Sequence, residues 1–136
     1  MTVDYTAIPG LNIWRPYLYA RLRNRAAGHF TLKLPMVIDT GSDRCLFDVE
    51  LAHRIGINPV DGGNLAGTTG VGGGIMTAIW PIEVEFPQLN RSVEIYAQFT
   101  NALPADVNGL LGNQGFLDRF SKVCFLPRRR QFSIES

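Results

Sequence analysis

The residues best suited to chemistry are an acid and its neighbours on a predicted tight turn. Asp39-Thr40-Gly41-Ser42 follows directly on the apolar run 34–38. This order places a carboxyl group where a buried strand leaves the core, while Gly41 permits a close backbone approach. Asp-Thr-Gly is also an ordinary turn sequence, so alone it equally fits a turn residue or a cap. It occurs once in the chain; chemistry that needs two facing carboxylates would therefore need two copies of the chain.

Composition narrows the possible functions. The chain has 136 residues, of which 46% are apolar and 18% are charged, which predicts one globular domain with its own core and argues against disorder. The formal net charge of +1 gives no reason to expect binding to nucleic acid or to anionic membranes. No apolar stretch reaches the length of a membrane span.

The first residues and the cysteines indicate a compartment. Residues 1–4 lack the basic and then apolar pattern of a secretory signal, so we expect a cytoplasmic protein. Cys45 and Cys124 are then expected to be reduced, buried thiols and not a disulfide. His29 and His53 are isolated, and the sequence predicts no metal site and no other cofactor.

Short extended segments separated by Gly, Pro and Asn dominate the chain. Residues 1–13 are predicted to form an irregular or extended arm with a turn at Pro9-Gly10. Strands are predicted over 17–22, 30–38 with a bend near Pro35, 75–86, 93–99 and 109–112, with a closing hairpin over 123–126 and 131–134. Strands this short and regular favour an all-β barrel or sandwich.

The sequence predicts one helix between residues 48 and 56, with recognisable caps at both ends. Asp48 can cap its N-terminus, and Gly56 can end it in a left-handed conformation. Phe47, Leu51 and Ile55 recur at a spacing of four, so they would share one face. A second, shorter helical segment is expected within 116–120. We expect the first helix to pack beside a sheet, because it is too short to form a layer.

Three elements in this order resemble the retropepsin-like aspartic proteases, the single-domain relatives of pepsin. The first is Val37-Ile38-Asp39-Thr40-Gly41-Ser42, and the second, well downstream, is Gly109-Leu110-Leu111-Gly112. The Gly-rich stretch Gly70-Val71-Gly72-Gly73-Gly74-Ile75 lies between them. The resemblance covers about residues 17–134. It implies an all-β, closed acid-protease barrel with one or two short helices over residues 1–136, active as a two-fold homodimer.

The resemblance assigns Asp39, Thr40 and Gly41 to catalysis. An Asp39 from each subunit would share a proton with its mate on the two-fold axis. One ionised acid would then activate water, and one protonated acid would polarise the peptide carbonyl. Thr40 would brace the pair across the axis, and Gly41 would let the substrate backbone lie close. The implied activity is that of an aspartic endopeptidase on peptide or protein substrates, without a cofactor.

The resemblance also assigns residues to the substrate and to the support of the turn. Ser42 is expected to hydrogen-bond an outer carboxylate oxygen of Asp39, which would favour the charged form. Asp43 would hold the substrate main chain, although a turn-stabilising acid or an ion pair explains it equally well. The expected flap over the substrate carries Gly70, Val71, Gly72, Gly73, Gly74 and Ile75. The strand expected to support the catalytic turn carries Leu110, Leu111 and Gly112.

One position departs from the resemblance. The family often carries an Arg after the apolar-apolar-Gly strand, able to pair with an acid such as Asp43 across the dimer. This chain has Asn113 there, which puts the interface ion pair in doubt. Arg119, Arg44 or Arg21 could compensate, and the sequence does not choose among them. The segments 1–13 and 131–136 are candidates for the sheet that joins two subunits.

Other interpretations stay open at this point. The chain could be a catalytically silent module of the same fold that dimerises or binds peptides, or an unrelated β-barrel binding protein with a coincidental turn. The Gly-rich stretch lacks the Lys-Ser or Lys-Thr of a phosphate-binding loop. Cys45 has no identifiable His partner, which argues against a thiol protease. Asp106 lacks the Thr-Gly that would hold a second acid, and Arg128-Arg129-Arg130 is expected to be a solvated turn.

Overall fold

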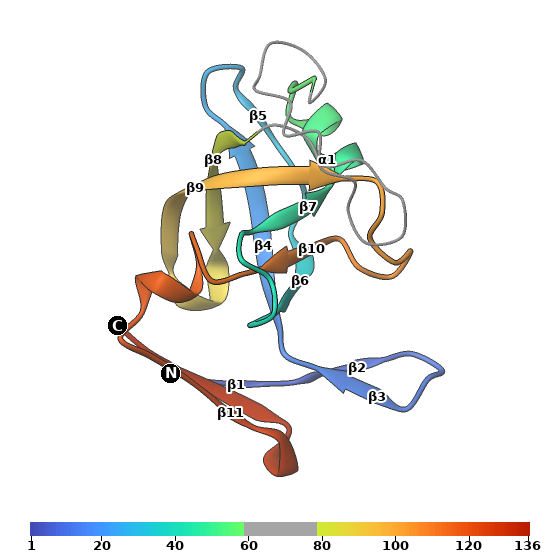
Figure 1. The fold of residues 1–136 in the computed structure, drawn as a ribbon, viewed down its shortest axis with the longest axis vertical. Helices are drawn as coiled ribbons and strands as arrows, with labels where there is room; N and C mark the ends of the chain where they lie inside the picture. Colours follow the sequence, from blue (N-terminus) through green and yellow to red (C-terminus); the bar gives the residue numbers. More distant parts are fainter. Residues whose placement is uncertain (59–78) are drawn as a thin grey trace.

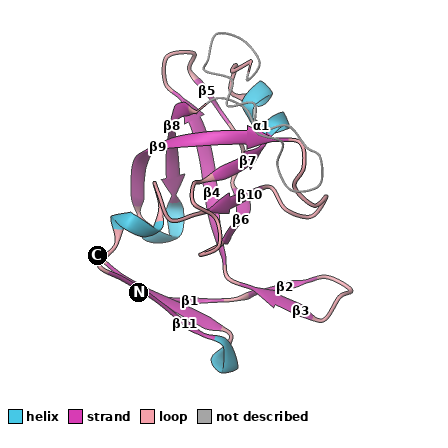
Figure 2. Cartoon of the chain, viewed as in Figure 1, coloured by secondary structure: helices cyan, strands magenta, loops and turns pink. Residues whose placement is uncertain are grey.

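The structure, a computed structural model, describes residues 1–58 and 79–136, and strands dominate it (Figure 1; Figure 2). The strands are β1 (Thr2–Asp4), β2 (Thr6–Ile8), β3 (Ile13–Arg15), β4 (Tyr17–Asn24), β5 (His29–Phe30), β6 (Leu34–Ile38), β7 (Leu46–Asp48), β8 (Trp80–Phe86), β9 (Arg91–Thr100), β10 (Gly109–Leu111), β11 (Lys122–Leu126) and β12 (Gln131–Glu135). The helical elements are α1 (Val49–Arg54) and the 3-10 turns η1 (Pro87–Leu89), η2 (Leu117–Arg119) and η3 (Pro127–Arg129).

Six strands of the described part close into a ring. They follow one another in the order β4–β6–β10–β7–β9–β8, and β8 pairs back to β4. The closing pair is antiparallel, with Leu22 of β4 opposite Val84 of β8. Closing a sheet on itself removes most of its free edges, which would otherwise invite pairing with other chains. The closed all-β barrel expected from the sequence is therefore confirmed.

The barrel interior is filled by the inward side of each strand. Along β4, Leu18, Ala20 and Leu22 are fully buried, and the side chains between them are exposed or half-buried. Aromatic rings fill the centre, where the ring centroids of Phe86 and Phe116 lie 5.1 Å apart in a tilted arrangement. Phe116 directly precedes η2, so this 3-10 turn confirms the short helical segment expected within 116–120.

The helix α1 begins and ends at the expected caps. The side chain of Asp48 accepts a hydrogen bond from the backbone N–H of Glu50 at 2.9 Å. At the other end, Gly56 has a φ of +75° and the N–H of Ile57 donates to the carbonyl of Ala52 at 2.9 Å, which is a Schellman motif. No helix within 1–58 or 79–136 is long and apolar enough to cross a membrane.

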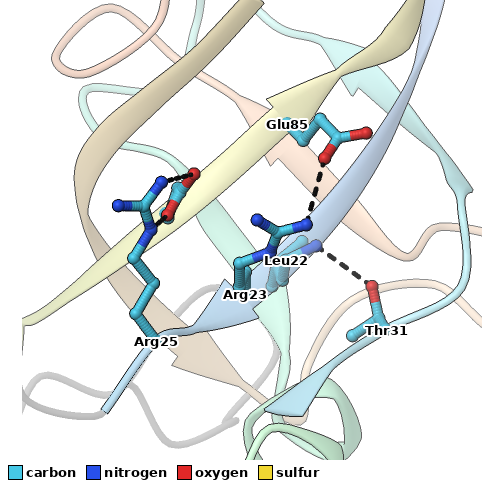
Figure 3. A network of polar contacts seen from close by, with 6 residues as sticks. Leu22, Arg23, Arg25, Thr31 and Glu85 are labelled. Carbon is cyan, nitrogen blue, oxygen red and sulfur yellow. Dashed lines mark hydrogen bonds and ion pairs between the residues drawn. The ribbon is translucent and has the colours of Figure 1, made fainter. Parts of the chain in front are cut away.

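The stretch predicted as one strand over 30–38 consists of two strands. β5 ends at Phe30 and β6 begins at Leu34, so the break lies at 31–33. Thr31 causes the break, because its hydroxyl accepts a hydrogen bond from the N–H of Leu22 at 3.0 Å (Figure 3). The sequence predicted a strand interrupted or bent near Pro35; the interruption lies just before β6, and Pro35 itself lies inside that strand.

The outer faces of β4 and β8 carry charges of opposite sign. Arg23 approaches Glu85 at 3.4 Å, and Arg25 forms an ion pair with Glu83 (Figure 3). The Arg25 side chain is 74% exposed, so solvent screens the second pair and its contribution to stability is small. These pairs lie on the solvent side of the ring.

Two smaller sheets lie below the barrel in the view of Figure 1. β12 is the middle strand of the terminal sheet, which we define as β1, β12 and β11, all antiparallel neighbours. β2 and β3 form a hairpin whose turn contains Pro9-Gly10, as expected. Residues 1–13, expected to be an irregular or extended arm, thus lie mostly in strands. The first and last strands pair with each other inside one chain, with Val3 opposite Phe132.

Candidate active site

The strand β6 delivers Asp39 to one end of the barrel. Ile38, its last residue, is buried and pairs in parallel register with Leu111 of β10. The N–H of Asp39 donates to the carbonyl of Leu111 at 3.0 Å, and the N–H of Ile38 donates to the carbonyl of Pro16 at 3.0 Å. Asp39 itself is half-buried. Two backbone hydrogen bonds therefore fix the acid on the barrel wall.

The four residues after Ile38 form a hydrogen-bonded turn. The N–H of Ser42 donates to the carbonyl of Asp39 at 3.2 Å. The N–H of Gly41 donates to Asp39 Oδ1 at 2.9 Å, so the carboxylate folds back onto its own turn as Asp side chains often do. A Cβ on Gly41 would lie 3.2 Å from the same oxygen. A hydrogen atom at position 41 therefore keeps room beside the carboxylate.

The strand β10 runs directly behind this turn. It lies between β6 and β7, with Leu110 opposite Val37 on one side and Leu46 on the other. Gly112, which follows β10, is buried against the carbonyl oxygens of Ser42 and Arg44, where a Cβ would not fit. The structure thus brings Leu110, Leu111 and Gly112 together with the Asp39 turn, as the sequence predicted for a supporting strand.

Asn113 is a contact of the turn that sequence reasoning did not foresee. Its side-chain Nδ2 donates to the carbonyls of Thr40 at 2.8 Å and Ser42 at 3.0 Å. Its backbone N–H also donates to Ser42 at 2.9 Å, and the next N–H, of Gln114, donates to Asp43 at 2.9 Å. The departure from the family Arg was visible in the sequence. The sequence did not show which carbonyls the Asn113 amide contacts, because those contacts exist only once β10 packs beside β6.

The expectation for Ser42 is wrong. Its hydroxyl donates to the carbonyl oxygen of Arg44 at 2.7 Å and not to the carboxylate of Asp39. The turn brings the carbonyl two residues ahead within reach of the hydroxyl, a local arrangement that Ser often adopts. The hydroxyl proton is therefore occupied within the turn, and the group that engages the carboxylate is the N–H of Gly41.

Thr40 and Gly41 in the turn, and Asp43 directly after it, are exposed. Among residues 1–58 and 79–136, the side chains of Thr40 and Asp43 make no hydrogen bond or ion pair. Arg119 donates to the carbonyl of Glu94 at 2.9 Å, and the guanidinium of Arg21 lies 5.4 Å from the ring centroid of Phe30. Neither of these arginines pairs with Asp43 in the described part of one chain.

Cys45 lies under the turn and is fully buried. Its Sγ contacts the carbonyl of Gln114 at 3.7 Å, and burial raises the pKa of the thiol to about 11. A protonated thiol without access to solvent is not a nucleophile. Cys45 and Cys124 are both free, as expected, although Cys124 is only half-buried.

Within 1–58 and 79–136, the remaining acids and histidines are dispersed. Asp106 pairs with Arg15 at 2.9 Å, and Asp118 Oδ1 accepts from the N–H of Gly115 at 3.0 Å. His53 is exposed on α1. In the described ranges, no three His, Cys, Asp or Glu side chains gather closely enough to hold a metal ion. The expected flap residues, Gly70, Val71, Gly72, Gly73, Gly74 and Ile75, lie outside the described residues.

Comparison with known proteins decides the fold. No protein-family model and no curated protein matches this sequence. The structure nevertheless aligns with the crystal structure of a retropepsin-like aspartic protease from Rickettsia conorii over 97% of both chains, with a TM-score of 0.64 and 14% sequence identity. The chain has a retropepsin-like fold. The resemblance that the Asp39 turn and β10 suggested is thereby confirmed at the level of the fold.

A second solved structure aligns over a smaller part of the molecule. EIAV protease, in complex with the inhibitor HBY-793, matches 78% of this chain and 88% of its own, with a TM-score of 0.47 and 18% identity. Sequence identities this low describe the retropepsin-like fold alone, because one fold can host different activities. Function therefore has to be argued from the Asp39 turn itself.

Proposed function

We propose that the protein is an aspartic endopeptidase that works as a homodimer. The observation that carries this proposal is the placement of Asp39. It stands on a hydrogen-bonded turn at the end of β6 in a retropepsin-like barrel, with β10 packed behind it. A single such acid per chain needs a second copy, and a two-fold axis through the turn would bring the two Asp39 carboxyls face to face.

The proposed chemistry needs two carboxyls in different protonation states. Two carboxyls a few ångströms apart cannot both ionise without a large electrostatic penalty, so the pair holds one proton between them. The ionised Asp39 takes a proton from a water molecule, which attacks the peptide carbonyl carbon. The protonated Asp39 gives its proton to the carbonyl oxygen. Collapse of the tetrahedral intermediate breaks the C–N bond. The departing amine takes the proton that came from water, and a hydroxyl of the intermediate returns its proton to the other Asp39, so the pair again holds one proton.

The turn supplies what this chemistry requires of a single protomer. The N–H of Gly41 donates to one carboxylate oxygen of Asp39 at 2.9 Å, which orients that acid on the turn. Thr40 and Asp43 are exposed, so we assign Thr40 to the contact between the two turns and Asp43, with Ser42, to the substrate backbone. Residues 70–75 are proposed as the flap over an extended peptide, and residues 1–136 as one protease domain that uses no cofactor.

The first test is hydrolysis of a mixed peptide library at acidic and neutral pH by the wild type and by Asp39→Asn. The expected result is cleavage by the wild type that is lost in Asp39→Asn and blocked by a statine-type inhibitor. Asp118→Asn is a matched control, because Asp118 is exposed and an amide oxygen can still accept from Gly115. Cleavage that survives in Asp39→Asn would refute the proposal. Peptide binding without cleavage would indicate a silent module of the same fold.

A subunit-mixing experiment tests the shared site. Wild-type protein is titrated with a growing excess of Asp39→Asn protein at constant wild-type concentration. If each site takes one Asp39 from each subunit, mixed dimers are inactive and the rate should fall as the variant is added. A site complete in one chain would keep its rate, and that result would refute the dimer. Analytical ultracentrifugation of the same samples reports whether mixed dimers form.

A further inference from the structure

The side chain of Asn113 spans the Asp39 turn. Its Nδ2 donates to two carbonyls, those of Thr40 at 2.8 Å and Ser42 at 3.0 Å. These carbonyls flank Gly41, whose N–H bonds the Asp39 carboxylate at 2.9 Å. One planar amide therefore donates one proton to the peptide unit that carries the Gly41 N–H and the other to the peptide unit between Ser42 and Asp43.

The neighbouring contacts do not replace this bridge. The backbone N–H of Asn113 reaches only the Ser42 carbonyl, at 2.9 Å. In the described part of the chain, the Thr40 carbonyl has the Asn113 amide as its hydrogen-bond donor. Loss of the amide would leave the Thr40 peptide held only through its chain neighbours. The orientation of the Gly41 N–H would then be less restricted.

We propose that Asn113 is a positioning residue that orders the Asp39 turn within one protomer. This inference rests on the proposed protease function and assigns a role to a residue outside the acid turn itself. Asn113 acts through the backbone carbonyls of Thr40 and Ser42, and its amide does not bond the carboxylate of Asp39. An ordered turn presents the acid in one orientation before the second copy arrives, so the loss of Asn113 should lower the rate of the chemical step more than the binding of substrate.

The experiment compares Asn113→Ala and Asn113→Asp with Gln114→Ala in the full-length protein. Gln114 is the matched control, because it is exposed and its contact with the turn comes from its backbone N–H, which Ala keeps. For Asn113→Ala we expect kcat to fall about 10-fold to 100-fold with KM changed less than about 3-fold. Gln114→Ala should keep both constants.

Two further measurements separate positioning from general loss of structure. Asn113→Asp places a carboxylate on the turn, so the apparent pKa values of the Asp39 pair should rise and the pH–rate profile should move to higher pH. Hydrogen–deuterium exchange of the peptide that covers 39–43 should be faster in Asn113→Ala than in Gln114→Ala, while exchange in β8 and β9 stays unchanged. This exchange readout does not depend on activity.

The possible outcomes are distinguishable. Cleavage that persists in Asp39→Asn overturns the proposed function, and this inference falls with it. Cleavage that depends on Asp39 but keeps its kcat, its pH profile and the exchange of 39–43 in the Asn113 variants overturns only the inference. Faster exchange across the whole barrel would show a general structural role and would also overturn it. A selective loss in kcat with local exchange at 39–43 supports it.

Discussion

Replacement of Gly112 by Ala tests the closest backbone contact behind the Asp39 turn. A Cβ at this position would lie 2.6 Å from the carbonyl oxygen of Ser42 and closer still to that of Arg44. Real Cβ atoms essentially never come nearer than 3.0 Å to such atoms, and both obstacles are backbone. The backbone must therefore move by about 0.4 Å at Ser42 and by more than that at Arg44, since no flexible side chain can give way.

The loss in free energy of unfolding follows from the packing and the hydrogen bonds that this backbone movement disturbs. Overpacking of a filled site destabilises a protein by about 1–3 kcal/mol. Moving 42–44 away also strains the hydrogen bonds from the N–H groups of Asn113 and Gln114, both 2.9 Å long, and each such bond contributes about 0.5–1.5 kcal/mol. The lower entropy of the unfolded Ala chain offsets about 0.4–1 kcal/mol of the loss. We expect the free energy of unfolding of Gly112→Ala to fall by about 2–4 kcal/mol.

Gly41→Ala is the matched control for this measurement. Its Cβ would meet only Asp39 Oδ1, at 3.2 Å, and Gly41 does not need a positive φ. Its free energy of unfolding should stay within about 1 kcal/mol of the wild type, whereas cleavage should fall because the methyl group crowds the carboxylate. Stability is measured by urea denaturation followed by far-UV circular dichroism, with the m-value checked for constancy.

Two results for the glycine variants would contradict close packing of β10 against the Asp39 turn. If Gly112→Ala unfolds within about 0.5 kcal/mol of the wild type with an unchanged m-value, β10 does not pack against the turn as closely as described. If Gly41→Ala loses as much stability as Gly112→Ala, the loss would reflect the replacement of glycine at either position and not the backbone contact at Gly112. Either outcome would remove the packing argument for the support of Asp39.

Three other perturbations have expected outcomes. Thr31→Val removes the acceptor of the buried Leu22 N–H and should lower the free energy of unfolding by about 1–3 kcal/mol in urea titrations. Burial raises the pKa of Cys45 from 9.0 to about 11, so the folded state keeps a proton that the unfolded state loses. The free energy of unfolding should therefore decrease between about pH 9 and 11 by at most about 3 kcal/mol, and by less in Cys45→Ala. If the free energy of unfolding falls equally steeply with pH in both proteins, this explanation is wrong. Arg25→Ala removes an exposed ion pair and should change stability by less than about 1 kcal/mol in the same assay.

Local signals predicted the parts of the fold that local interactions determine. The caps of α1 were readable because Asp48 and Gly56 act on their own neighbours in the chain. The hairpin of β11 and β12 was readable from two apolar runs around a basic turn. By contrast, β7 was not predicted, because a three-residue strand is too short to show alternation and its last residue, Asp48, also caps the helix.

Tertiary contacts decided the rest, including the details of the site. The break between β5 and β6 depends on the hydroxyl of Thr31, which meets a residue nine positions earlier in the chain. In the turn, the Asp-Thr-Gly sequence correctly located the acid at a strand end, but it gave the wrong partner for Ser42. The bridge made by Asn113 needs β10 beside β6, a pairing between segments 73 positions apart.

The first strand of the chain, β1, pairs with the last strand, β12, in the terminal sheet. Met1 and Ile134 exchange hydrogen bonds, with the amino group donating at 3.0 Å and the N–H of Ile134 donating back at 2.9 Å. Both ends of one protomer therefore lie close together. A tandem fusion of two copies would join this place on one copy to the same place on the other. In such a fusion Asp39 can be replaced in one half while the other half keeps the acid.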